Sequence, residues 1–167
     1  MDEHNFPTDG KTANERSPRG PDAPRHIFVV EEEDDLRQLT AETLIDAGFH
    51  VDVAGDGESA WATLRHDKYD LLIVGQFLPK MSGVELLKKL HTARITLPSI
   101  MVTSILPTWE FALHPHLQAV TMLRKPYTVH QLLGLVNGVL PDLPVDRRGS
   151  APNQRQQTPG DRDRLRP

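Results

Sequence analysis

Residues 69–90 of this chain read YDLLIVGQFLPKMSGVELLKKL, and the fold can be inferred from this stretch. Its uninterrupted apolar run, LLIV, is typical of a strand that is covered on both faces in a parallel sheet. Beyond a loop, Ser82 and Glu85 have the three-residue spacing of a capping box, which predicts that a helix begins there. The strand is expected to end near Gly75, at the edge where open parallel sheets carry their functional groups.

The same order of strand and helix opens the apolar part of the chain. The run IFVV at 27–30 predicts a second buried strand, and it ends abruptly in the acidic cluster 31–35. Leucines at helical spacing follow this cluster. Asp34 or Asp35 is available as the helix cap, and Gly48 is the expected stop.

Two more units are shorter. Alternating residues at 51–53 indicate a half-exposed edge strand, and Asp56 is placed to begin a short helix. Another buried strand ends at Thr103. Because proline cannot continue a helix, Pro107 and Pro115 confine the helix that follows to a few residues.

The last unit completes the sheet. Residues 119–123 are predicted to form the fifth strand, and Thr128 with Gln131 is a second capping pair that opens the final helix. Five strand-helix units predict an α/β fold built on one doubly wound, five-stranded parallel sheet.

The 167 residues fit one domain with two tails. Residues 1–24 are polar and contain several prolines, so we expect them to be disordered, with the domain at 25–140. Residues 141–167 are also expected to be disordered. Their arginines are interleaved with aspartates, which favours a solvated tail over a nucleic-acid-binding arm.

Composition excludes several classes of protein. The chain has no cysteine, so disulfides, thiolate metal sites and cysteine nucleophiles are ruled out. It shows neither a bilayer-length apolar run nor a secretion signal, and its net charge of -4 offers no broad surface for nucleic acid. We therefore expect a cytoplasmic protein without nucleic-acid or membrane partners.

Five segments, taken in order, resemble the receiver domain of response regulators in two-component signalling. They are IFVVEEEDDLRQL, the AGDGESA turn, DLLIVGQFLPKMSGVELL, the strand end IMVTS and the RKP turn. The resemblance covers about residues 26–140. It implies a flavodoxin-like receiver fold with strand order 2-1-3-4-5, and a histidine kinase, a phosphotransfer protein or another response regulator as partner.

In receivers, an aspartate at the end of the third strand takes a phosphoryl group from a histidine kinase, and magnesium is bound beside it. The cation and a lysine offset charge on the phosphoryl oxygens, and a hydroxyl holds the product. The resemblance places these roles on the following positions: the acceptor on Gly75, the acidic pair on Glu31 and Glu32, the carbonyl ligand on Phe77, the hydroxyl on Thr103, the aromatic switch residue on Met122 and the lysine on Lys125.

Gly75 departs from the family pattern at the position of the phosphoryl acceptor. Glycine has no side chain that could attack phosphorus or bind a metal, so we predict that aspartyl-phosphate chemistry is absent. The amide of Gln76 should point to the opposite face of the strand. Magnesium would retain Glu31 and Glu32 with carbonyl or water oxygens, which predicts weak binding or none and no other cofactor.

Other interpretations of these positions stay open at this stage. The acidic cluster could be a solvated helix start rather than a remnant pocket, because acids are favoured near helix N-termini. Lys125 could pair with Glu31 or Glu32 as a structural ion pair. Thr103 could simply end its strand with a satisfied hydroxyl. Met122 would lose any rotamer switch tied to phosphorylation.

Four residues near the two prolines suggest further sites. Trp109 and Phe111 could fill the core or contact a partner. His114 and His116 have an H-x-H spacing that could bind a metal, but no acidic or thiol partner lies nearby in sequence.

These observations lead to three hypotheses. The first is a stand-alone, non-enzymatic receiver that acts by phosphorylation-independent protein–protein interaction. The second is a receiver that accepts the phosphoryl group on Glu31 or Glu32. The third is a flavodoxin-like module for a small molecule, which glutamates after the first strand disfavour because they repel phosphate.

Overall fold

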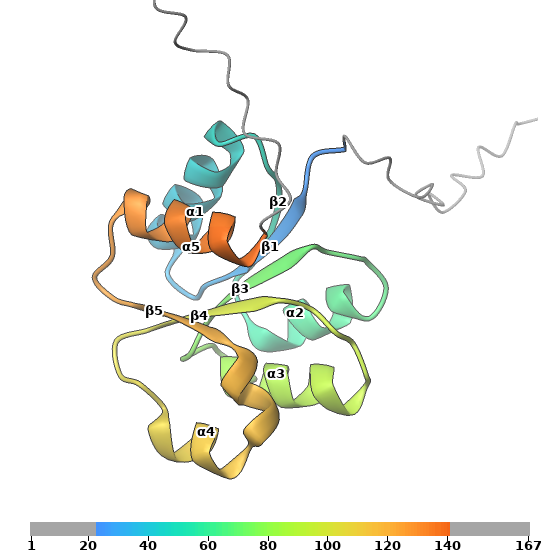
Figure 1. Ribbon diagram of the computed structural model, residues 1–167. Helices are drawn as coiled ribbons and strands as arrows, with labels where there is room; N and C mark the ends of the chain where they lie inside the picture. The colour runs from blue at the N-terminus through green and yellow to red at the C-terminus, as the bar shows by residue number, and fades with distance from the viewer. Residues whose placement is uncertain (1–22, 141–167) are drawn as a thin grey trace, which may run out of the picture.

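The computed structural model describes residues 23–140, which form a five-stranded parallel sheet in the order β2-β1-β3-β4-β5 (Figure 1). The predicted α/β class and strand order are confirmed. The strands are β1 (His26–Val30), β2 (His50–Ala54), β3 (Leu71–Gly75), β4 (Ser99–Thr103) and β5 (Thr121–Arg124). The helices are α1 (Asp34–Asp46), α2 (Gly57–Leu64), α3 (Gly83–Thr92), α4 (Thr108–Leu113), the 3-10 helix η1 (Pro115–Ala119) and α5 (Val129–Val139).

Helices cover both faces of the sheet, and each face has its own core (Figure 1). On one face, α2 and α3 pack on alternate residues of the central strands, with Leu86 fully buried. On the other face, α1 and α5 contribute Leu44, Leu132 and Val136. The central strands β1, β3 and β4 are buried at every residue, as their unbroken apolar runs predicted.

Three helices have the caps expected from the sequence. Ser82 and Glu85 form the capping box of α3, and Thr128 and Gln131 form that of α5. The Asp56 carboxylate accepts a hydrogen bond from the backbone of Ser59 at the start of α2, and this bond, with the Ser59 hydroxyl and Lys80, lowers the pKa of Asp56 to about 2.

Two boundaries differ from the sequence prediction. The N-cap of α1 is Glu33, without a side-chain cap bond, because Asp34 already lies in the first turn and its carboxylate bonds Arg37. The fifth strand begins at Thr121, since the preceding residues form η1 with Pro115 in its first turn.

The predicted disorder of the two tails falls on residues outside the described range, apart from Ala23 and Pro24. Within that range, every helix is too short or too polar to cross a bilayer.

Candidate functional site

The carboxyl ends of four strands meet at one edge of the sheet, where the sequence placed the site. Glu31 directly follows β1, Gly75 ends β3, Thr103 ends β4, and Lys125 directly follows β5. The Lys125 Nζ lies 3.0 Å from the Glu31 Oε2. The structure therefore brings together residues separated by almost the whole domain and joins two of them in an ion pair.

Glu31 is the member of the acidic pair that enters the site. Only 5% of the residue is exposed, whereas Glu32 is exposed to solvent. The backbone around Glu31 is fixed by a bond from its N–H to Ala54 and by a bond from the Arg37 guanidinium to its carbonyl. The buried carboxylate thus stands in a defined position with Lys125 as its cation.

Gly75 faces this pair. A Cβ atom built on Gly75 would lie 3.3 Å from the Glu31 Oε2 and 3.4 Å from the Leu78 Cδ2. A side chain at position 75 would therefore point into the site, beside the carboxylate of Glu31. The third strand ends at Gly75, as predicted, and the site has a hydrogen atom at this position.

Gln76 makes a contact that the sequence did not suggest. We expected its amide on the face of the strand opposite Gly75, and the register agrees: Gly75 pairs with Val102, so Gln76 lies level with the next residue, Thr103, whose hydroxyl donates to the Gln76 Oε1. The same hydroxyl lies 2.6 Å from the Ile105 carbonyl and accepts from the Ile105 N–H. Gln76 directly follows β3 and keeps the alternation of that strand, so its amide bonds across to β4 while position 75 faces Glu31.

The remaining two predicted positions lie outside this cluster of polar contacts. Phe77 is 57% exposed at the mouth of the site. Met122 is partly buried and packs against the core on the α2 and α3 face, so it fills space in the fold.

The oxygen ligands needed for magnesium are not assembled here. The Glu31 carboxylate is engaged by Lys125, and Gly75 supplies no side-chain oxygen. Among residues 23–140, no three His, Asp or Glu side chains gather closely enough to hold a metal ion. These residues do not fit the cation that the family resemblance implies.

A histidine cluster lies where α3 meets η1. The rings of His91 and His116 stack with their centroids 3.9 Å apart, and His114 lies 5.6 Å from His116. Burial, with the nearby His91, His114 and Lys88, lowers the pKa of His116. The sequence singled out His114 and His116 but missed His91, because this third ring comes from a different helix.

The two aromatic residues of α4 have different environments. Trp109 is 67% exposed, whereas Phe111 packs against the core on the α2 and α3 face. Phe111 therefore helps to fill the core, whereas Trp109 lies on the surface.

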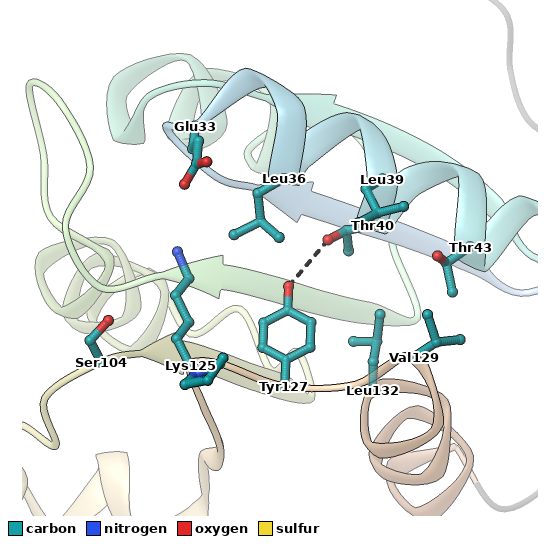
Figure 2. A pocket seen from close by; sticks show the side chains of 11 residues that line it. Glu33, Leu36, Leu39, Thr40, Thr43, Ser104, Lys125, Tyr127, Val129 and Leu132 are labelled. Carbon is teal, nitrogen blue, oxygen red and sulfur yellow. Dashed lines mark hydrogen bonds between the residues drawn. The ribbon is translucent and has the colours of Figure 1, made fainter.

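A groove between α1 and α5 is the feature that sequence analysis missed entirely (Figure 2). We call it the α1–α5 groove; it has a volume of about 440 Å³ and begins beside Lys125. Across its floor the hydroxyls of Thr40 and Tyr127 lie 3.3 Å apart, and burial raises the pKa of Tyr127. Its apolar walls are formed by Leu36, Leu39, Pro126, Val129 and Leu132.

Comparisons with known proteins agree with this architecture. Residues 27–137 match the family described as the response regulator receiver domain. The chain is 33% identical over 114 residues to the sensory transduction protein RegX3 of Mycolicibacterium smegmatis, covering 68% of this chain and 50% of that protein. It is 34% identical to the transcriptional regulatory protein CpxR of Escherichia coli K12, covering 68% and 48%.

A solved structure of the chemotaxis protein CheY4 of Vibrio cholerae superimposes with a TM-score of 0.64 at 27% sequence identity, covering 70% of this chain and 99% of that one. The chain spans about half the length of the curated relatives it matches. The similarity is thus to the receiver part of these longer proteins.

Proposed function

This chain belongs to the response regulator receiver family, and we propose that it acts in two-component signalling by binding a partner protein without being phosphorylated. Gly75 carries this proposal, because it stands beside Glu31 and Lys125 where receivers place the acceptor carboxylate. A signalling module can keep its binding surfaces while losing this one nucleophile. The scaffold around the position remains complete through all five strands.

The neighbouring contacts support the same proposal. In a receiver that accepts a phosphoryl group, the lysine and the hydroxyl must be available to its oxygens. Here Lys125 bonds Glu31, and Thr103 bonds Gln76 and Ile105. The polar groups of Lys125 and Thr103 are thus already bonded within the protein.

The class of partner follows from the family resemblance. We propose a histidine kinase, a phosphotransfer protein or another response regulator. Some relatives are named as transcriptional regulators, and the lack of a nucleic-acid partner remains a prediction for this chain.

Transfer to a different carboxylate is the competing proposal. Glu31 is buried and ion-paired, and it extends from β1 rather than from β3. Glu32 is exposed and lies on the same loop. Neither residue has the position of the missing acceptor, so we place this second.

The experiment is incubation of the full chain with acetyl phosphate and Mg²⁺, followed by intact-mass measurement. We expect no adduct on the wild type. The Gly75→Asp variant restores a carboxylate next to Glu31 and Lys125, and we expect it to gain one phosphoryl group; Gly75→Asn has nearly the same size without a carboxylate and should gain none.

A stoichiometric, Mg²⁺-dependent adduct on the wild-type chain would contradict the proposal. Loss of that adduct in Glu31→Gln or in Glu32→Gln would then assign the accepting carboxylate.

A further inference from the structure

The α1–α5 groove exposes apolar side chains on both of its walls (Figure 2). Leu39 on α1 is 56% exposed, and Val129 on α5 is 51% exposed. Leu36 and Leu132 extend the apolar surface between them. The groove therefore offers a site for one apolar side chain, with the Thr40 and Tyr127 hydroxyls at its floor.

One end of the groove is acidic. Glu33 lines it, and Glu32 and Asp35 are exposed next to Glu33 at the start of α1. The nearest cations are already engaged: Lys125 bonds Glu31, and Arg37 bonds Asp34. Among the described ion pairs none involves Glu32, Glu33 or Asp35, so this end has uncompensated negative charge.

The C-terminal sequence has the complementary pattern. Residues 141–167 contain six arginines and four aspartates, and they end in DRDRLRP. In that ending a single leucine, Leu165, is flanked by Arg164 and Arg166. An apolar side chain between two cations matches an apolar groove with an acidic end.

We propose that the Arg164–Leu165–Arg166 segment binds in the α1–α5 groove of its own chain. Leu165 packs against Leu39 and Val129, and the two arginines lie along the acidic start of α1. The proposal concerns contacts within one chain, and it goes beyond the proposed function.

The chain is long enough for this contact. Val129, at the start of α5, lines the groove, and α5 runs for 11 residues, which is about 16 Å of helix. Leu165 follows Leu140 by 25 positions in the sequence, and an extended chain of that length spans about 80 Å. The return from the end of α5 to the groove therefore needs only a fraction of the available length.

The charge balance sets the expected strength of the contact. Asp161 and Asp163 precede the segment and oppose its binding to an acidic surface. The contact should therefore depend on the arginines that flank Leu165, and it should weaken as salt screens exposed charges.

A spin-label experiment on the full chain tests the proposal. Because the chain has no cysteine, Gly160→Cys provides a unique site for a nitroxide close to the segment. We expect the amide signals of residues 36–43 and 129–132 to lose most of their intensity, compared with the same sample after reduction of the nitroxide. Signals of α3, on the other face of the sheet, should keep theirs.

Variants in the tail assign the effect to particular residues. Leu165→Ser, and separately Arg164→Glu with Arg166→Glu, should restore the signals of the groove. Arg155→Glu changes the same kind of charge outside the segment and is the matched control, which should leave the broadening in place.

Three results would overturn the proposal: no broadening, broadening spread equally over both faces, or broadening that survives the Leu165→Ser change. Mixing an isotope-labelled chain with a spin-labelled, isotope-free chain tests whether a second copy of the protein occupies the groove. Broadening of groove signals in that mixture would show that a second copy binds there instead of the chain's own segment.

Discussion

At the scale of single residues, an ion pair beside Gly75 joins residues that follow two different strands. Lys125 reaches the buried Glu31, whose carboxylate lies beside the place that a side chain at position 75 would take. The ion pair is largely removed from solvent, with 6% of the Glu31 side chain and 26% of the Lys125 side chain exposed. Its members therefore depend on one another more than an exposed pair would.

Replacing Lys125 with Met should lower the free energy of unfolding by about 2 kcal/mol at pH 7, because a buried carboxylate is left without its cation. Adding Glu31→Gln to this variant should recover part of the loss. Urea unfolding of the wild type, both single variants and the double variant measures the coupling. Additive losses in the double variant would show that the pair is not coupled.

At the scale of elements, three histidines gather where α3 meets η1, and the pKa of one of them, His116, is lowered. His91 and Lys88 face His116 from α3, and His114 faces it from the end of α4. The lowered pKa of His116 means that folding favours its neutral ring. In the unfolded chain this histidine binds a proton more readily, so the folded state loses stability as pH falls below about 6.5.

We expect the free energy of unfolding to decrease between pH 7.5 and about pH 5.5, and His116→Phe to make this decrease smaller because it removes the titrating ring. Glu85 and Asp56 titrate below this range, since capping bonds lower the pKa of both carboxyls. His130→Phe, at an exposed position of α5, is the matched control and should leave the decrease intact. Equal slopes for the wild type and His116→Phe would refute the prediction.

At the scale of the whole molecule, leucines on the helices of the two faces of the sheet differ in burial. The α2 and α3 face is covered by a core that includes the fully buried Leu86. The α1 and α5 face has a core near the sheet, but its helices leave the α1–α5 groove between them, with Leu39 on the wall. Leucines on these helices therefore have different roles.

Leu86→Ala should lower the free energy of unfolding by about 2–5 kcal/mol, because it leaves a cavity in the core. Leu39→Ala should change it by less than about 0.5 kcal/mol, because its side chain is mostly exposed. Thermal and urea unfolding measure both effects. A large loss in Leu39→Ala would mean that the groove wall is part of the core.

The sequence by itself determined the class of the fold and the absence of a side chain at position 75. Unbroken apolar runs of this length are typical of strands covered on both faces, and capping pairs such as Ser82 with Glu85 mark where helices begin. Both signals are local, so they can be read without coordinates. The same holds for Gly75, because the absence of a side chain is a property of the residue itself.

Only the tertiary structure decided how distant side chains pair. Nothing in the local sequence distinguishes Glu31 from Glu32 as the partner of Lys125, or predicts that Gln76 bonds Thr103. The α1–α5 groove likewise exists only because two helices far apart in the chain pack side by side. These features depend on the direction of side chains at strand ends and on the spacing between helices, which the packing of the whole domain sets.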